Sequence, residues 1–425
     1  MKFTTRLQLS AMMFLEFFIW GAWFVTLGTF LINNLHANGA ETGAVFSTQS
    51  WGAIIAPFII GLIADRFFNA EKILGILHIA GAILLYQVYS IGAVTNVYPP
   101  VVFYYLLIYM ILFMPTLALV NSISFNQMTN TEKQFPPVRV WGTIGWIVAG
   151  LAISFFVWDS EANIAVGLLK NTFLMASVAS LALGIFSFTL PKTRPKIAKG
   201  AKVKVSEILG LDALKLLKDK NYLIFFIASI LIDIPLAFYY QYANPFLIDK
   251  GMANATAKMS LGQFFEIFFL LLLPFFFKKF GFKKTIMAGM LAWAVRYALF
   301  AYGNAGDLTF MLIIGIILHG ICYDFFMVSG QIYTDAKAGT KFKSAAQGLI
   351  TLATYGIGML IGFWIAGLIK DAYTTTTIVD NVSKAVSNWK MIWIIPSIIA
   401  LVVFLLFAIF FNDKNEKPVE QTVNI

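Results

Sequence analysis

Long apolar segments recur along the whole 425-residue chain, and shorter polar stretches separate them. A helix of about 20 apolar residues is long enough to cross the hydrocarbon core of a bilayer. We expect twelve such spans, near residues 8–32, 43–64, 73–94, 100–124, 139–158, 164–190, 221–248, 256–277, 285–303, 308–333, 344–369 and 389–411. The pattern therefore predicts an all-α integral membrane protein.

Composition excludes a water-soluble protein, since 59% of the residues are hydrophobic and only 12% are charged. The single cysteine, Cys322, excludes an internal disulfide and any site built from several cysteines. The three histidines, His36, His78 and His319, are widely separated in the sequence. We therefore expect no metal site and no cofactor.

The net charge of +10 is compatible with an anionic partner such as nucleic acid. In membrane proteins, however, Lys and Arg gather in cytoplasmic loops. With a cytoplasmic N-terminus, most basic residues of this chain fall in cytoplasmic segments. We expect both termini in the cytoplasm, contacts with membrane lipid, and no nucleic-acid partner.

The longest hydrophilic interruption, residues 191–220, is rich in lysine and divides six spans from six. We expect an N-terminal half (1–190), a cytoplasmic linker (191–220), a C-terminal half (221–411) and a cytoplasmic tail (412–425). Within the linker, Glu207 to Lys218 alternates apolar and polar residues, as a surface helix does. A solvated linker is favoured over one that binds anionic lipid.

A short charged loop follows the second span and contains Asp65 and Arg66. A basic segment after the eighth span, from Pro274 to Lys284, takes the equivalent place in the second half. Such loops bridge helix ends in contacts that form and break as two halves move. The run Gly61 to Arg66 resembles the G-x-x-x-D-R motif of the major facilitator superfamily.

Ionisable residues inside apolar spans indicate a transporter, because each is costly in hydrocarbon unless it is paired or faces a wet cavity. We single out six of them: Glu16, Asp233, Glu266, Arg296, His319 and Asp324.

The fifth span places a guanidinium, a hydroxyl and a large ring on one helical face. Arg139, Thr143 and Trp146 follow one another at steps of four and three residues. A planar polar solute needs such a mixture of donors and aromatic surface. Equally compatible with the spacing is a cytoplasmic anchor at Arg139 and a lipid-facing ring at Trp146.

The eighth and tenth spans carry further polar groups in apolar surroundings. Gln263 and Glu266 share a face, and His319 and Tyr323 lie four residues apart with Asp324 next. A carboxylate partly removed from water holds a proton more readily near neutral pH. Asp324 and Glu266 are therefore our main candidates for coupling to a proton gradient, with a buried structural pair as the alternative.

The remaining intramembrane groups are less specific. Glu16 is open to three roles: a second titrating site, a substrate acceptor, or the partner of an arginine. Asp233 precedes a helix-kinking Pro235 and is a further proton candidate. We expect Arg296 to neutralise a carboxylate of its own half.

Downstream in the seventh span, Tyr239, Tyr240, Gln241 and Asn244 supply aromatic and amide groups suited to sugar hydroxyls.

Several runs resemble the bacterial nucleoside:proton symporter family over nearly the whole chain. They include Phe135 to Gly145, Met114 to Ser124 and Tyr323 to Gly330. The resemblance implies proton-coupled import of nucleosides by alternating access across the bacterial cytoplasmic membrane, with substrate held between the halves. It also implies a substrate site made of Arg139, Thr143, Trp146, Gln263, Glu266, His319, Tyr323 and Asp324.

The chain departs from a well-known permease of that family at several of these positions. Trp146 and Tyr323 stand where that permease has phenylalanine, His319 where it has tyrosine, and Glu16 where it has glutamine. Uptake of another polar solute, such as a modified nucleoside or a sugar, is therefore an alternative, and so is coupling to sodium. An enzyme is not expected, because no nucleophile lies beside a base. We expect a monomer.

Overall fold

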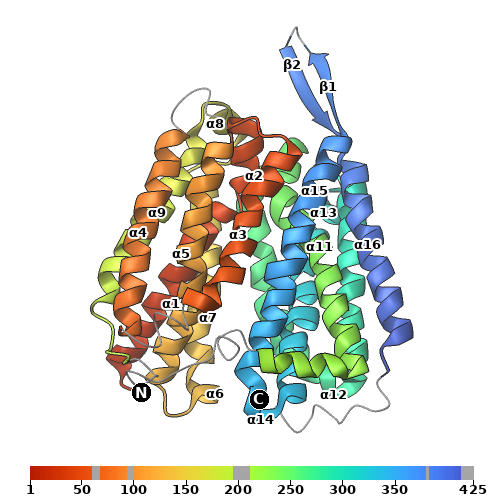
Figure 1. The fold of residues 1–425 in the computed structure, drawn as a ribbon. Helices are drawn as coiled ribbons and strands as arrows, with labels where there is room; N and C mark the ends of the chain where they lie inside the picture. Colours follow the sequence, from red (N-terminus) through yellow and green to blue (C-terminus); the bar gives the residue numbers. More distant parts are fainter. Residues whose placement is uncertain (60–67, 93–98, 195–210, 380–381, 413–425) are drawn as a thin grey trace. The chain divides into compact units, whose positions relative to one another are not determined.

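The structure, a computed structural model, describes residues 1–59, 68–92, 99–194, 211–379 and 382–412 (Figure 1). The predicted gating residues Asp65 and Arg66 lie outside the described residues, as does most of the predicted linker.

The described chain is almost entirely helical. Its elements, in order, are α1 (Phe3–Phe24), α2 (Leu27–Thr29), η1 (Phe30–Asn34), α3 (Gly39–Ile59), α4 (Ala70–Ile91), α5 (Pro99–Asn126), α6 (Thr131–Gln134), α7 (Pro136–Phe155), α8 (Glu161–Ala165), η3 (Leu168–Lys170), α9 (Asn171–Ser187), η4 (Leu211–Lys218), α11 (Lys220–Asp249), α12 (Ala255–Tyr302), α13 (Thr309–Cys322), η5 (Tyr323–Val328), α14 (Ser329–Thr351), η6 (Leu352–Gly358), α15 (Met359–Ala372), β1 (Thr374–Val379), β2 (Val382–Ser387) and α16 (Trp389–Phe410).

Ten of the described helical segments are long and apolar enough to cross a membrane: Phe3–Asn34, Ala70–Ile91, Pro100–Asn126, Pro136–Phe155, Leu168–Ser187, Lys220–Asp249, Ala255–Tyr302, Thr309–Gly339, Ala345–Ala372 and Trp389–Phe410. The expected eighth and ninth spans both fall within α12, where the backbone leaves helical geometry at Gly281 (φ 74°). A positive φ is readily adopted by glycine, which explains why the direction changes at this residue.

The chain divides into two compact units. Unit 1 comprises Met1–His36, Thr48–Leu211 and Asn254–Ser260, and unit 2 comprises Ala37–Ser47, Asp212–Ala253 and Leu261–Ile425.

Unit 1 is held together by close packing of α1 against α7 and of α4 against α9. Glycines make these approaches possible. A methyl group at Gly142 of α7 would lie 2.6 Å from the Phe17 ring, and one at Gly145 would press on the Phe14 carbonyl of α1. The two prolines that open α7 stand in its first turn, where a missing amide proton costs little.

Unit 2 contains three features that the sequence analysis did not foresee or placed differently. An antiparallel hairpin pairs β1 with β2 and extends beyond the ends of α15 and α16 (Figure 1), so the expectation of an all-α chain was wrong here. Four threonines, an isoleucine and a valine form β1, and β-branched residues favour strands.

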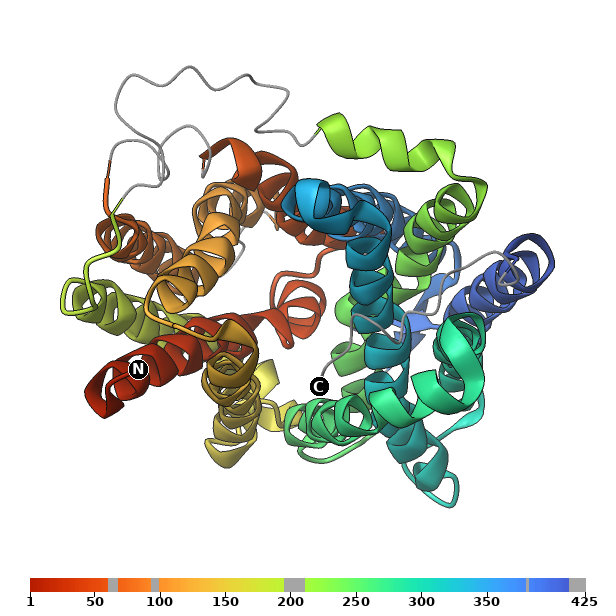
Figure 2. The same cartoon turned by 90° about the horizontal axis from the view of Figure 1, so that it is seen from below.

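The expected surface helix Glu207 to Lys218 is described from Leu211 onward and forms the 3₁₀ helix η4. Figure 2 shows this yellow-green segment running along the outer edge of the unit 2 helices. Its Ala213 is fully buried in a cluster with Ala338, Ala346 and Leu349. This part of the linker is therefore packed on the protein.

The third feature is a pair of π-helical segments, η5 and η6, which interrupt the helices on either side of them. Single π-helical turns of this kind occur often at functional sites.

Candidate functional site

In unit 1, the predicted stripe on α7 packs along α1. The Arg139 guanidinium lies 4.1 Å from the centre of the Phe17 ring. The Trp146 ring meets Trp20 edge to face, with centroids 5.5 Å apart. Trp146 is therefore a packed ring of the α1–α7 interface, and Thr143 lies on the same half-buried face.

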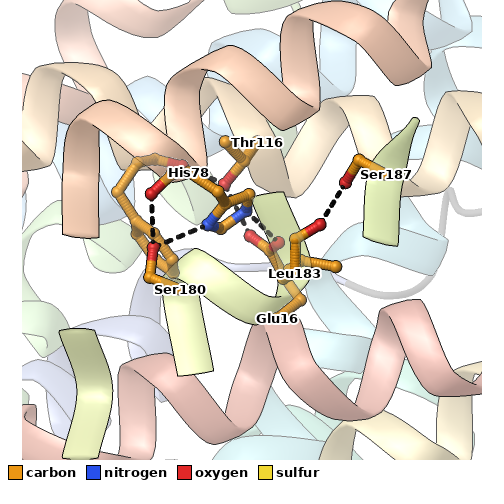
Figure 3. Close-up of polar contacts among 7 residues, drawn as sticks. Glu16, His78, Thr116, Ser180, Leu183 and Ser187 are labelled. Carbon is orange, nitrogen blue, oxygen red and sulfur yellow. Dashed lines mark hydrogen bonds and ion pairs between the residues drawn. The ribbon is translucent and has the colours of Figure 1, made fainter. Parts of the chain in front are cut away.

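Glu16 of α1 is fully buried and sits in a polar cluster that joins four helices (Figure 3). Its Oε2 lies 2.8 Å from Nε2 of His78 on α4, and its Oε1 accepts a hydrogen bond of 2.5 Å from the Thr116 hydroxyl on α5. Nδ1 of His78 lies 3.2 Å from Oγ of Ser180 on α9. Among the described residues, the ionisable partner of Glu16 is thus a histidine rather than an arginine.

In unit 2, helices α12 and α13 approach so closely that a methyl group at Gly320 would lie 2.7 Å from the Glu266 amide nitrogen. This contact puts the predicted carboxylates Glu266 and Asp324 on neighbouring helices, where they interact electrostatically. The Asp324 side chain is only 1% exposed. Neither of its oxygens has a hydrogen-bond partner among the described residues.

Tyrosines surround these carboxylates. The hydroxyl of Tyr323, in η5, lies 3.0 Å from that of Tyr355, in η6, so a polar contact joins the two π-helical segments. Tyr240 of α11 interacts electrostatically with Tyr323 and Glu266. The structure therefore brings together four of the expected site residues, Tyr240, Glu266, Tyr323 and Asp324.

Arg296 forms no ion pair with a carboxylate in the part of the chain that the structure describes, so the expectation for it was wrong. Its Nη1 donates to Nδ1 of His319 over 3.0 Å, and its guanidinium carbon lies 3.7 Å from the centre of the Tyr239 ring. His319 stacks on the same Tyr239 ring at 5.1 Å. Arg296 is fully buried, and its Nε and Nη2 find no partner among the described residues.

The other candidates of unit 2 include Asp233, which interacts electrostatically with Tyr240 and Tyr355 of this cluster. Asp233 is fully buried, and its carboxylate oxygens lack partners within the described part of the chain. Gln241 is buried and donates to the Tyr242 hydroxyl over 3.1 Å. Asn244 is also buried, whereas Gln263 is half-buried on α12.

Sequence reasoning missed several residues of these clusters: His78, Thr116, Ser180 and Tyr355. His78 carried a usable signal, because an ionisable group within an apolar span needs a partner. The hydroxyls and the tyrosine carried none, since such residues are common throughout membrane helices.

Comparison with known proteins gives a consistent result. The family model described as nucleoside H⁺ symporter matches residues 1–416. The chain is 42% identical over 415 residues to the putative nucleoside transporter YegT of Escherichia coli (strain K12), covering 97% of this chain and 95% of that protein. It is 33% identical over 428 residues to the xanthosine permease of the same organism, with 97% of each covered.

Among solved structures, the crystal structure of the nucleoside transporter NupG superimposes with a TM-score of 0.82 at 32% identity, covering 96% of this chain and 100% of that one. NupG from Escherichia coli (strain K12) is described as a nucleoside permease. The similarity extends over both units, so it is not confined to a shared motif. On these grounds the chain belongs to the nucleoside H⁺ symporter family of membrane transporters.

Proposed function

We propose that the protein imports nucleosides together with protons across the bacterial inner membrane by alternating access. Membership of the symporter family and the likeness to nucleoside permeases support the substrate class and the coupling ion. The observation that carries the mechanism is Asp324, a buried carboxylate without a hydrogen-bond partner among the described residues. A carboxylate so placed is stabilised by a proton, and its neighbour Glu266 strengthens that preference while it is charged.

In this proposal Asp324 and Glu266 take up the coupling proton and also hydrogen-bond the substrate. Protonation removes the charge that opposes movement of the carrier within an apolar environment. A ligand or proton shifts a conformational equilibrium only by its differential affinity for the two states. Asp324 therefore couples import to the gradient if its proton affinity differs between the outward-open and inward-open states.

The substrate contacts follow from the chemistry of a nucleoside, which has a planar base and a hydroxyl-rich sugar. Aromatic rings at Trp146 and Tyr323 offer surface for the base. Donors and acceptors for base and ribose come from Arg139, Thr143, Tyr240, Gln241, Asn244, Gln263, Glu266, His319 and Asp324. Asp233 and Glu16 are further proton-coupling candidates in this scheme.

We further propose twelve membrane helices, six in residues 1–190 and six in 221–411, with the linker, the tail and both termini in the cytoplasm. The protein is proposed to act as a monomer. Its family and relatives are transporters, and this agrees with a protein that carries a solute without converting it.

Uptake of labelled uridine into proteoliposomes with an imposed pH gradient tests the proposal. Accumulation above equilibrium that collapses when the gradient is abolished is expected. Absence of any nucleoside accumulation would contradict the function, and accumulation driven by sodium alone would contradict the coupling ion.

A second candidate is a modified nucleoside or another polar solute. The observation that favours it is Arg296, which makes His319 a hydrogen-bond donor at a position where tyrosine stands in a known permease. Competition of uridine uptake by adenosine, xanthosine and sugars separates the candidates.

A further inference from the structure

The polar cluster around Glu16 lies in unit 1, whereas Asp324 and Glu266 belong to unit 2. All four of its side chains are buried, with exposures of 0% for Glu16, 2% for His78, 1% for Thr116 and 0% for Ser180. A buried acid–base pair of this kind must share its protons among fixed partners. The number of hydrogens available can therefore be counted from the contacts.

The count begins at Ser180, whose hydroxyl has a single hydrogen. That hydrogen is donated to the backbone carbonyl of His78 over 2.8 Å. The 3.2 Å contact between Ser180 Oγ and His78 Nδ1 then requires a hydrogen on Nδ1. Nε2 of His78 faces Oε2 of Glu16 at 2.8 Å, and one proton must lie between those two atoms.

The number of protons that Glu16 and His78 can hold depends on the orientation of the Thr116 hydroxyl. This hydroxyl lies 2.5 Å from Glu16 Oε1 and also 2.5 Å from the backbone carbonyl of Phe113, yet it too has one hydrogen. When Thr116 donates to Oε1, Glu16 needs no proton there. When Thr116 turns its hydrogen to the Phe113 carbonyl, its oxygen can accept a hydrogen bond from a proton on Oε1.

The surroundings supply few competing charges. Tyr109 of α5 interacts electrostatically with Glu16. The other titratable residues on α1, α4, α5 and α7, besides Glu16 and His78 themselves, are Arg6, Glu71, Lys72, Tyr86, Tyr89, Tyr104, Tyr105 and Arg139. Arg139 stacks on Phe17, and Glu71 accepts from the Thr193 amide over 2.8 Å. Helix α9 carries no titratable side chain.

We propose that Glu16 and His78 form a second proton-binding site of the transporter, which holds one proton at rest and takes up another by rotation of the Thr116 hydroxyl. The first proton leaves the pair with no net charge, and the second gives it a charge of +1. No heavy atom has to move. The proposal rests on the proposed function for its role in transport, although the proton site can be observed without transport.

Glu16→Gln provides the first test, because a glutamine amide can donate to Thr116 Oγ as the proton-loaded acid would. The readout is counterflow of labelled uridine at equal pH on both sides, measured from about pH 5 to pH 8.5. The parent is expected to show a titration step that Glu16→Gln lacks, with the variant retaining at alkaline pH the rate that the parent reaches only in acid. A Glu16→Gln profile that keeps the parent's step overturns the proposal.

Two buried serines of α9 provide a test variant and its control for the hydrogen bond of His78 Nδ1. Ser180→Ala removes the acceptor of the Nδ1 hydrogen, whereas Ser187 donates only within its own helix, to Leu183 over 2.6 Å (Figure 3). Ser180→Ala is expected to move the step to lower pH by about one unit, a roughly tenfold loss of proton affinity. Ser187→Ala should leave the step in place, and equal shifts in both variants would contradict the assignment.

The protonation of His78 can also be measured directly, so the proposal stays testable if a variant exchanges no nucleoside. The chain has three histidines, so ¹⁵N-histidine labelling in lipid gives three sets of ring signals, and His78→Asn identifies one of them. The His78 signals of the parent should change with pH, and those of Glu16→Gln should not. Invariant His78 signals in the parent overturn the inference. A parent that exchanges no nucleoside contradicts the proposed function instead.

Discussion

The Arg296 guanidinium donates a hydrogen bond from Nη1 to Nδ1 of His319 over 3.0 Å in the interior of unit 2. An arginine has no acceptor, so Nδ1 must accept and the hydrogen of the neutral imidazole must stand on Nε2. The nearby cation also opposes protonation of the ring. Arg296 therefore fixes His319 as a neutral donor.

Removing this guanidinium should make His319 responsive to pH. In Arg296→Gln the imidazole loses the neighbouring cation, while its burial still opposes protonation. We expect uridine affinity, which should be insensitive to His319 titration in the parent, to acquire a step on the acid side of the ordinary histidine pKa of about 6.5. Binding measured by calorimetry from neutral pH into acid checks the prediction.

The control for that step is the double variant Arg296→Gln/His319→Tyr, which should lose it. Arg296→Lys, which retains a cation and a donor, should resemble the parent. If Arg296→Gln and the double variant give the same pH profile, the step does not come from His319 and the tautomer assignment is wrong.

The close approach of α12 to α13 predicts a large effect of adding one methyl group. In Gly320→Ala the new Cβ would meet backbone atoms of Phe265 and Glu266, which cannot turn away as a side chain can. We expect a loss of about 1 to 3 kcal/mol in stability and a marked loss of uptake. Gly348→Ala is the control, because nothing lies within 4 Å of its Cβ. Thermal unfolding in detergent compares them, and equal midpoints would contradict the packing.

Asp219 begins α11 and links it to α14. It accepts from the Tyr222 amide over 3.0 Å and from Lys337 Nζ over 2.9 Å. Partial burial acts to raise the pKa of Asp219, but these hydrogen bonds and the Lys337 charge outweigh it and lower the pKa below its ordinary value. A lowered pKa in the folded state stabilises the protein above the pKa of the unfolded chain, and that contribution is lost as pH falls through the folded value.

Two substitutions separate the roles of Asp219. Asp219→Asn keeps an N-cap and loses the ion pair, whereas Asp219→Ala loses both, at a further cost of about 1 kcal/mol. Near pH 7 the unfolding temperature should be highest for the parent, lower for Asp219→Asn and lowest for Asp219→Ala. The difference in unfolding temperature between the parent and Asp219→Asn should become smaller in acid. A difference that widens as pH falls would contradict the sign of the shift.

The aromatic surface at Trp146 is expected to hold the base of the substrate. Base–aromatic stacking contributes about 1 to 3 kcal/mol, so Trp146→Ala should weaken uridine binding by roughly fivefold to 150-fold. Trp146→Phe restores the residue of a known permease and should retain most of the affinity. Equal affinities of the Ala variant and the parent would remove Trp146 from the site.

The apolar periodicity and the isolated polar groups were enough to predict helices and many of the residues that meet in unit 2. A polar side chain in an apolar span is stabilised by polar neighbours, and this favours a common location for Glu266, Tyr323 and Asp324. The close packing of α12 against α13 makes that location possible. The pairing of Glu16 with His78 was not predicted, since 62 residues separate them and their contact depends on how α1 packs near α4. The same holds for Arg296, whose partner proved to be neutral.

Local backbone departures were also beyond sequence reasoning. The π-helical turns at Tyr323 and Leu352 follow no residue pattern that distinguishes them from an ordinary helix. The hairpin formed by β1 and β2 had a signal in its β-branched run, which was outweighed by the apolar spans on either side.

The central claim is that Asp324 couples nucleoside import to the proton gradient, and one measurement tests it most directly. Labelled uridine accumulation in proteoliposomes with an imposed pH gradient is compared for the parent and Asp324→Asn, with counterflow at equal pH recorded for both. Asp324→Asn should lose accumulation driven by the gradient, while counterflow remains measurable at a reduced rate. Accumulation at the parent's level in Asp324→Asn would contradict the account and move the coupling proton to Glu266, Asp233 or Glu16.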